Sequence, residues 1–351
     1  MRGWVLAAAM VGAFSQGKES HVLYVQSGEG LKWFSVEGRT GAVTPKGSLA
    51  TPKLAPYYLR SSPNQKFLYA AGVPNRLQVF SIASDGSLTR TAETESPGGP
   101  CYVDIHPSGR WVATANYGPG MTMIYPVAAD GTVGEASTHP SGPQTHSVRF
   151  HPDGKTLLSL SVAGRKIMRF ALEGDAPPST LEMPDLGPRH LAFSPRGTFA
   201  YVVHERPIRV SSLKVGEGLE VVGTWSALEP GVAEKDGLAA AEIAVAPSGR
   251  FVYASVRDFS KEGGLNGLAV FAADPETGVL RLVEFVPSGG VSPRGFVIDP
   301  SGTMLFVLNE IPGTLMRFRI DPETGRLRSF GDPVEIGTPA IGIAWVVLRP
   351  D

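Results

Sequence analysis

One hairpin motif occurs six times along the chain, and it constrains the possible folds more than any other feature. Each copy has a proline in a short polar turn, flanked by apolar runs rich in β-branched and aromatic residues. The copies are SSPNQKFLYAA (61–71), IHPSGRWVATA (105–115), FHPDGKTLLSL (150–160), FSPRGTFAYVV (193–203), VAPSGRFVYAS (245–255) and IDPSGTMLFVL (298–308). Their prolines are 44, 45, 43, 52 and 53 residues apart. Such periods are typical of propeller blades or helical arrays, and the strand-forming composition excludes the arrays.

A second turn follows each hairpin and occurs seven times. Its Asp-Gly and Glu-Thr-Gly sequences supply the positive φ angles that short hairpins need. The copies are EGRTGAV (37–43), DGSL (85–88), DGTV (130–133), EGDAP (173–177), GEGL (216–219), DPETGVL (274–280) and DPETGRL (321–327). Six copies of one turn and seven of the other indicate that one blade is divided between the chain ends. Pairing HVLYV (21–25) with IGIAWVVL (341–348) would close the ring and hide its sheet edges.

The sequence therefore predicts an all-β fold. We expect one seven-bladed β-propeller domain over residues 20–351, with four antiparallel strands per blade and one blade shared by the two chain ends. The 42 glycines and 30 prolines among 351 residues fit a chain with many tight turns. The net charge is −1 with both signs interspersed, which excludes the electrostatic footprint of a nucleic-acid-binding protein.

The N-terminus has the pattern of a secretory signal peptide. Arg2 precedes an apolar run from Trp4 to Phe14, and Ala13 and Ser15 have the spacing of a cleavage site. The run is too short to span a bilayer. We therefore predict a signal peptide over residues 1–15 and a periplasmic or secreted protein. The alternative is a frayed extension or a packed first strand, which would leave the protein cytoplasmic.

The only cysteine, Cys101, limits the chemistry available to the chain. It excludes an intramolecular disulfide and a zinc site built from cysteines. The sequence also contains no G-x-S-x-G elbow, no H-E-x-x-H pair and no glycine-rich dinucleotide fingerprint. A water molecule activated by a base is therefore a simpler expectation than a covalent intermediate.

Charged residues recur at two positions of the hairpin repeat. Because its two strands are antiparallel, residues six before and ten after each proline reach the same mouth of the propeller. The first set is Tyr57, Cys101, His146, Arg189, Ala241 and Arg294, with Glu242 beside Ala241. The second set is Val73, Tyr117, Val162, Glu205, Arg257 and Glu310, with Asn116 and Asn309 adjacent. Three arginines, one histidine and three carboxylates are thus expected together, although solvated charges at strand ends are the simpler explanation for any single residue.

The remaining histidines of the repeat are expected elsewhere. His106 and His151 belong to the proline turns at the opposite mouth, where we assign them turn or packing roles. Alternate strand residues face opposite sides, so His190 and His204 are predicted to point away from the channel.

This set of residues suits an acidic substrate. Guanidinium groups bind carboxylates or phosphate esters and stabilise an oxyanion that develops during acyl transfer. A histidine near a carboxylate provides general acid–base capacity near neutral pH. Opening or closing of a lactone ring is the reaction that this combination favours. A mouth so rich in arginine is a poor cation site.

The chain resembles the lactonase family of seven-bladed propellers, which includes bacterial 6-phosphogluconolactonase and fungal carboxy-cis,cis-muconate cyclase. The resemblance covers nearly the whole chain after residue 20. It rests on ANYGPG (115–120), THSVRFHPDGK (145–155), GPRHLAFSP (187–195), Glu205, AAAEIAVAPSGRFVYAS (239–255) with Arg257, SPRGFVIDPSG (292–302) and AWVV (344–347). The ordered set of THS, GPRH, AEI and PRGF is its most specific part.

The resemblance implies a catalytic set and a reaction without metal or organic cofactor. It places the active-site groups of the cyclase on His146, Arg189, Glu205 and Arg294. Two residues depart from the family pattern, because His204 replaces the usual asparagine and Glu310 a frequent glutamine.

We expect Arg189 and Arg294 to bind the anionic group of the lactone and to polarise its carbonyl. His146, oriented by Glu205, would activate water and protonate the ring oxygen. Arg257, Glu242, Asn116, Tyr117 and Glu310 complete the predicted substrate pocket.

Two other functions remain open at this point. One is an exported, non-catalytic propeller that binds a small anionic ligand or a protein partner at the same mouth. The other is a cyclase acting on a muconate-type diacid. A six-bladed calcium-dependent gluconolactonase fits least well, given seven repeats and an arginine-rich mouth. No sequence feature indicates an oligomeric state.

Overall fold

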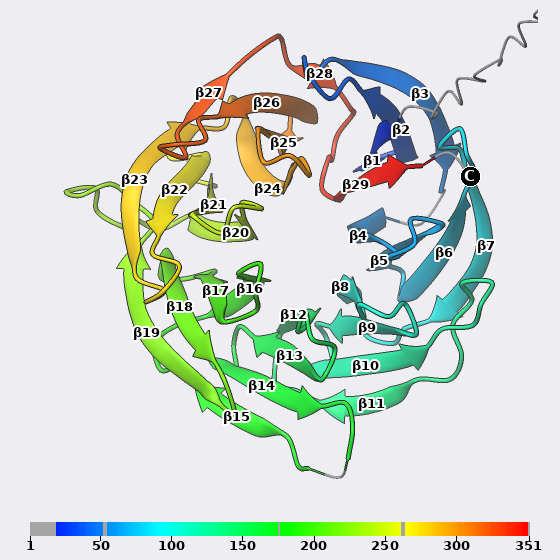
Figure 1. Ribbon diagram of the computed structural model, residues 1–351, viewed down its shortest axis with the longest axis horizontal. Helices are drawn as coiled ribbons and strands as arrows, with labels where there is room; N and C mark the ends of the chain where they lie inside the picture. Colours follow the sequence, from blue (N-terminus) through cyan, green and yellow to red (C-terminus); the bar gives the residue numbers. More distant parts are fainter. Residues whose placement is uncertain (1–18, 52–54, 175, 261–263, 350–351) are drawn as a thin grey trace, which may run out of the picture.

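Seven β-sheets surround a central opening (Figure 1). The computed structural model describes residues 19–51, 55–174, 176–260 and 264–349, and these contain strands and turns without a helix. The predicted signal peptide lies outside the described residues. Inner strands of successive blades contact one another all the way around the ring. The predicted seven-bladed propeller is confirmed.

Six blades each come from one continuous stretch of chain, with the innermost strand first. The first three are β4 (Ala55–Ser61), β5 (Phe67–Val73), β6 (Arg76–Ile82), β7 (Leu88–Glu95); β8 (Pro100–Ile105), β9 (Trp111–Asn116), β10 (Met121–Pro126), β11 (Ser137–Pro140); and β12 (Thr145–Phe150), β13 (Thr156–Ser161), β14 (Lys166–Ala171), β15 (Ser179–Glu182). The next three are β16 (Pro188–Phe193), β17 (Phe199–His204), β18 (Arg209–Val215), β19 (Leu219–Ser226); β20 (Leu238–Val245), β21 (Phe251–Asp258), β22 (Gly267–Ala273), β23 (Leu280–Pro287); and β24 (Val291–Ile298), β25 (Met304–Ile311), β26 (Thr314–Ile320), β27 (Leu327–Ser329) with β28 (Val334–Glu335).

The seventh blade joins the two chain ends. Its innermost strand is the last of the chain, and the strands are β29 (Ile343–Leu348), β1 (Ser20–Ser27), β2 (Gly30–Val36) and β3 (Val43–Ala50). β1 and β29 pair antiparallel, with Val22 opposite Val346. In Figure 1 the red β29 lies beside the blue β1, on the inner side of the ring. The predicted closure is confirmed: β29 pairs with the inner edge of β1 and completes the seventh blade.

The proline turns have one recurring geometry. Two residues after the proline, the backbone is left-handed, with φ between 72° and 74° at the glycines and 59° at Gln65. The glycines are Gly109, Gly154, Gly197, Gly249 and Gly302. A histidine before one turn also bonds to the next blade, because His106 Nε2 donates to the Gly154 carbonyl (2.8 Å) and His151 Nε2 to that of Gly197 (2.9 Å). Both histidines therefore have the turn role that the sequence predicts.

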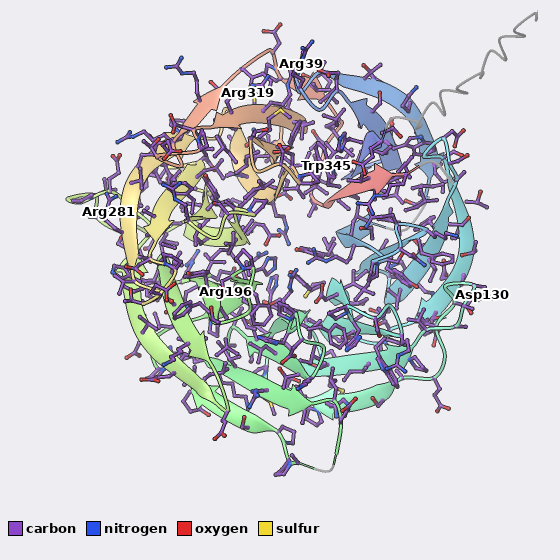
Figure 2. All side chains as sticks on the ribbon, viewed as in Figure 1. Arg39, Asp130, Arg196, Arg281, Arg319 and Trp345 are labelled. Atoms are coloured by element: carbon purple, nitrogen blue, oxygen red, sulfur yellow. The ribbon has the colours of Figure 1, made fainter. Side chains whose placement is uncertain are left out.

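The hydrophobic core lies between neighbouring blades. Val203, Val256 and Phe271, for example, are fully buried between the β16–β19 and β20–β23 sheets. Burial of each side chain of this size stabilises the fold by roughly 1.5–3 kcal/mol. The outermost strands, such as β3 and β7, consist mainly of exposed and half-buried residues, so the outer edge of the ring faces solvent. Figure 2 shows Asp130 and Arg281 at the outer edge and Trp345 on the inner side.

Candidate active site

β-Bulges at one mouth of the channel expose the side chains that form the site. In five inner strands the pairing register skips one residue: Tyr57, Cys101, His146, Arg189 and Arg294. In β20 it skips Ala241 and Glu242 opposite a single residue of β21. A bulged residue is unpaired and its side chain is turned out of the regular alternation. These are the residues six positions before each proline, so the repeat itself places them at one level.

The channel contains a cavity of about 330 Å³, within the size range of small-molecule sites. All five singly bulged residues line it, together with Glu242. Trp345 and Ile343 of β29, the inner strand between β24 and β4, also line it. The structure therefore brings His146, Arg189, Glu242 and Arg294 to one cavity, as the register predicts.

Arg189 is held firmly in the wall of this cavity. Its side chain is 2 % exposed, and its Nη1 donates to the Ala241 carbonyl (2.5 Å) and to His190 Nε2 (3.1 Å). Its Nε lies 3.5 Å from a carboxylate oxygen of Glu205. Burial, together with the nearby Arg294, lowers the pKa of Arg189, while Glu205 opposes that effect. A fixed guanidinium of this kind needs little reorganisation to meet a developing negative charge.

His190 lies in the cavity, so the prediction that it points away is wrong. The bulge at Arg189 shifts the alternation, and both side chains face the channel. His190 Nδ1 is 3.0 Å from Glu242 Oε1. A carboxylate accepts, so the ring proton is on Nδ1 and is donated to Glu242. This leaves Nε2 to accept from Arg189 Nη1, an atom that also lies 3.4 Å from Nδ1. Burial raises the pKa of Glu242 and, with Arg189, lowers that of His190 well below its ordinary value.

His146 is the second imidazole of the cavity. It is 6 % exposed, its ring lies 5.0 Å from that of His190 and 5.8 Å from that of Tyr117. Its Nδ1 has no hydrogen-bond partner among the described residues. Burial, followed by the charge of Arg189, holds the pKa of His146 well below its ordinary value. The imidazole is therefore neutral at neutral pH and has a nitrogen available to accept a proton.

We expected Glu205 to orient His146, but it lies beside two arginines instead. Its carboxylate is 3.5 Å from Arg189 Nε and 3.7 Å from Arg257 Nη2, so it pairs with two guanidiniums. Arg257 also donates to the carbonyls of Ala239 and Ala240. Burial and the neighbouring Arg189 lower the pKa of Arg257 to about 9. Glu205 and Arg257 thus support the wall behind Arg189, outside the lining of the cavity.

Arg294 is the least restrained of the mouth arginines. Its guanidinium lies over the Tyr57 ring, 5.7 Å from the centroid, and it is half-buried. Within the described ranges it forms no hydrogen bond or ion pair. A guanidinium with unused donors at the cavity surface is free to contact a ligand.

Comparison with known proteins identifies the family of the chain. Residues 8–347 match the family model described as "Lactonase, 7-bladed beta-propeller". The chain is 30% identical to a 6-phosphogluconolactonase of Bacillus subtilis (strain 168), over 90% of this chain and 95% of the relative. It is 31% identical to a 6-phosphogluconolactonase of Klebsiella pneumoniae subsp. pneumoniae, over 82% and 86% of the two chains.

The chain belongs to the lactonase family of seven-bladed β-propellers. It is an enzyme of the carboxylic-ester hydrolase class, a lactonase. A solved structure of a periplasmic gluconolactonase from Pseudomonas aeruginosa superposes on it with a TM-score of 0.81 at 26% identity, and the match covers 95% of this chain and 100% of the other. The fold of the chain is thus shared with a gluconolactonase of known structure.

Besides Arg257, three more predicted pocket residues lie outside the lining of the lactonase cavity. Tyr117 is 39 % exposed and contacts His146 edge to face. Glu310 accepts a hydrogen bond from Ser292 Oγ (2.7 Å) and lies close enough to Arg257 to influence its pKa. Asn116 is fully buried, and its amide donates to Ser96 Oγ and to the Pro97 carbonyl, so it holds the connection between β7 and β8.

Sequence reasoning missed a deeper polar layer of the same cavity. Tyr58, Arg60, Tyr102 and Arg149 all line it, below the bulged residues. Arg60 and Arg149 are both three residues before a repeat proline, so extending the register analysis by three positions would have found them.

The described residues contain no group of three or more His, Cys, Asp and Glu side chains that could hold a metal ion. The Cys101 thiol is a poor nucleophile, since burial raises its pKa to about 12.

Within the described ranges, no helix has the length and apolar character needed to cross a membrane.

Proposed function

We propose that this lactonase hydrolyses the ring ester of an anionic sugar lactone, as its 6-phosphogluconolactonase relatives are named to do. The observation that carries the proposal is the convergence of a neutral, buried imidazole and two guanidiniums on one cavity, at His146, Arg189 and Arg294. Four arginines line the cavity, namely Arg60, Arg149, Arg189 and Arg294, against the single carboxylate of Glu242. Such a lining favours an anionic substrate.

The proposed reaction needs one base and an oxyanion site. His146 accepts a proton from water as the water oxygen bonds to the lactone carbonyl carbon. Arg189 and Arg294 stabilise the negative charge that develops on the carbonyl oxygen. When the ester bond breaks, the protonated His146 returns its proton to the ring oxygen. The product is a hydroxy acid, which releases one proton at neutral pH.

Acid release measured in a pH-stat tests the proposal. The panel should include a phosphorylated gluconolactone, unphosphorylated gluconolactone and an aromatic lactone, each corrected for its uncatalysed hydrolysis. We expect the wild type to accelerate an anionic lactone and His146→Gln to lose most of that acceleration. His139→Gln, on the outer strand β11, is the matched control and should keep the wild-type rate. Equal rates for wild type and His146→Gln would contradict the assignment of the base.

We also propose that the enzyme is exported. Support comes from the signal-like residues 1–15 and from the periplasmic gluconolactonase whose structure it resembles. Mass analysis of the mature N-terminus tests this directly. We expect a chain that begins at Gln16, and an intact Met1 on protein recovered from the cytoplasm would contradict it.

A further inference from the structure

A second charged cluster lies deeper in the channel than the bulged residues. Arg60, Asp104 and Arg149 come from the inner strands of three consecutive blades, each three residues before a repeat proline. Both arginines line the same cavity as Arg189 and Arg294, with side chains 30 % and 23 % exposed. The cavity therefore has two separate levels of guanidinium groups.

The deeper cluster carries more positive than negative charge. Asp104 Oδ1 lies 3.1 Å from Arg60 Nε and 3.7 Å from Arg149 Nη1. Its other oxygen accepts the backbone N–H of Phe150 (2.9 Å). One carboxylate is thus shared between two guanidiniums. Glu242 is the other acid that acts on them, and with Arg189 and Arg294 in the same lining the cavity keeps an excess of positive charge.

The two guanidiniums also have more N–H donors than the Asp104 carboxylate can accept. Each presents five N–H groups, and Asp104 has only two oxygens. Arg149 Nε is buried without a hydrogen-bond partner among the described residues. Arg60 Nη2 contacts the Tyr102 hydroxyl at 3.4 Å, and that hydroxyl already accepts from Tyr58 (2.9 Å). A bound anion would be held by the Nη groups of the two guanidiniums, since Arg149 Nε itself is buried.

The wall between the two levels consists of aromatic rings, against which a compact organic group could pack. The Tyr58 and Tyr102 rings stack with centroids 3.8 Å apart, and the Tyr102 ring meets His190 edge to face at 4.8 Å. From the bulged residue to the deeper residue of one strand is three residues, or about 10 Å at ~3.3 Å per residue. A sugar lactone that carries a phosphate at the carbon farthest from its carbonyl spans a comparable length.

We propose that Arg60 and Arg149 form an anion subsite that binds the terminal phosphate of the substrate. This inference rests on the proposed function and assigns different roles to the two pairs of arginines. The deeper pair holds the phosphate by guanidinium hydrogen bonds, and Arg189 and Arg294 at the mouth are left for the lactone carbonyl. The subsite therefore determines specificity for phosphorylated over unphosphorylated lactones.

Steady-state kinetics with two substrates test the subsite. Arg149→Met keeps the aliphatic stem and removes the guanidinium. We expect its KM for phosphorylated gluconolactone to rise about tenfold or more, while kcat/KM for unphosphorylated gluconolactone changes less than about twofold. Arg165→Met removes an exposed arginine outside the cavity and serves as the matched control, with both substrates unaffected. Arg149→Lys should recover part of the lost affinity, since an ammonium restores the positive charge but not the bidentate N–H donors of a guanidinium.

Inorganic phosphate provides an independent reading of the same subsite. It should inhibit wild-type turnover of the phosphorylated lactone competitively, and its affinity should fall about tenfold or more in Arg149→Met. An equal loss of kcat/KM for both lactones, with phosphate affinity unchanged, would overturn the subsite and leave the three residues a structural ion cluster.

The two proposals fail in different ways. If the wild type hydrolyses no lactone, the proposed function fails, and phosphate affinity measured by calorimetry alone decides the subsite. If phosphate binds with unchanged affinity to Arg149→Met, the subsite is wrong whatever the turnover. Thermal unfolding followed by circular dichroism shows whether each variant folds. Arg60→Met, tested in the same way, replaces Arg149→Met if that variant does not fold.

Discussion

At the scale of single residues, one hydrogen-bonded chain prepares the cavity wall. Glu242 accepts the Nδ1 proton of His190, and His190 Nε2 accepts from Arg189. The carboxylate fixes the tautomer of the imidazole, and the imidazole in turn fixes a guanidinium. His190 and Glu242 are therefore positioning residues for Arg189.

Substitution of Glu242 tests this chain. Glu242→Gln keeps an acceptor for His190 Nδ1, so kcat/KM should stay within about threefold of the wild type. Glu242→Leu removes the acceptor, and kcat/KM should fall by about one to two orders of magnitude. Steady-state hydrolysis of the preferred lactone measures both. Equal activity of the Gln and Leu variants would show that the carboxylate does not position the arginine.

The pH dependence of activity follows from the shifted pKa of His146. A base must be unprotonated to act, and burial beside Arg189 holds the pKa of this imidazole well below its ordinary value. We therefore expect kcat/KM to be level from about pH 8 down to about pH 6.5, the ordinary histidine value. The fall should come only at lower pH. A half-maximal point at or above about pH 6.5 would contradict a buried neutral base at this position.

At the scale of secondary-structure elements, the proline turns were predictable and the bulges were not. Turn residues have strong local preferences, so Gly197 and its counterparts identify their own backbone conformation. A bulge depends on the packing of the whole hairpin. Strict alternation therefore placed His190 on the wrong side of its strand, although the repeat register found its neighbour Arg189. Asn116 shows the same limit, because only three-dimensional packing brings Ser96 and Pro97 to its amide.

The turn between β16 and β17 provides a stability test for this element. Gly197 has φ 73°, and a Cβ there would lie 2.6 Å from His151 Nε2. Gly197→Ala should lower the free energy of unfolding by about 1–2 kcal/mol from backbone strain alone, and more if the His151 bond breaks. Gly216→Ala, in an exposed turn with open space around it, should change it by less than about 0.5 kcal/mol. Urea unfolding measures both, and equal values would contradict the strained-turn explanation.

At the scale of the whole molecule, closure of the ring was predictable because two turn counts differed by one. It joins Val22 to Val346 across the chain ends and buries both, together with Tyr24. The deeper arginine cluster escaped prediction for the opposite reason. Its residues share a register position with apolar residues such as Ala192 and Val297 in other blades, so no repeated charge marks that level.

Removal of β29 tests the closure. A chain that ends at Gly342 would expose the inner edge of β1 and the apolar surface around Val22. We expect it to lose the cooperative unfolding transition and all lactonase activity, whereas a chain that ends at Arg349 keeps both. Differential scanning calorimetry measures the transition. A native-like transition without residues 343–351 would show that the split blade does not hold the ring together.

The central claim is that ring closure brings guanidiniums from distant parts of the sequence to one catalytic cavity. The most direct test is kcat/KM of Arg294→Ala for an anionic lactone, measured beside its thermal unfolding midpoint. Arg294 makes no hydrogen bond or ion pair within the described ranges, so the midpoint should stay within about 2 °C of the wild type. Turnover should fall by about 10²–10³-fold, the usual effect of losing one oxyanion donor. An unchanged rate in the folded variant would contradict the account.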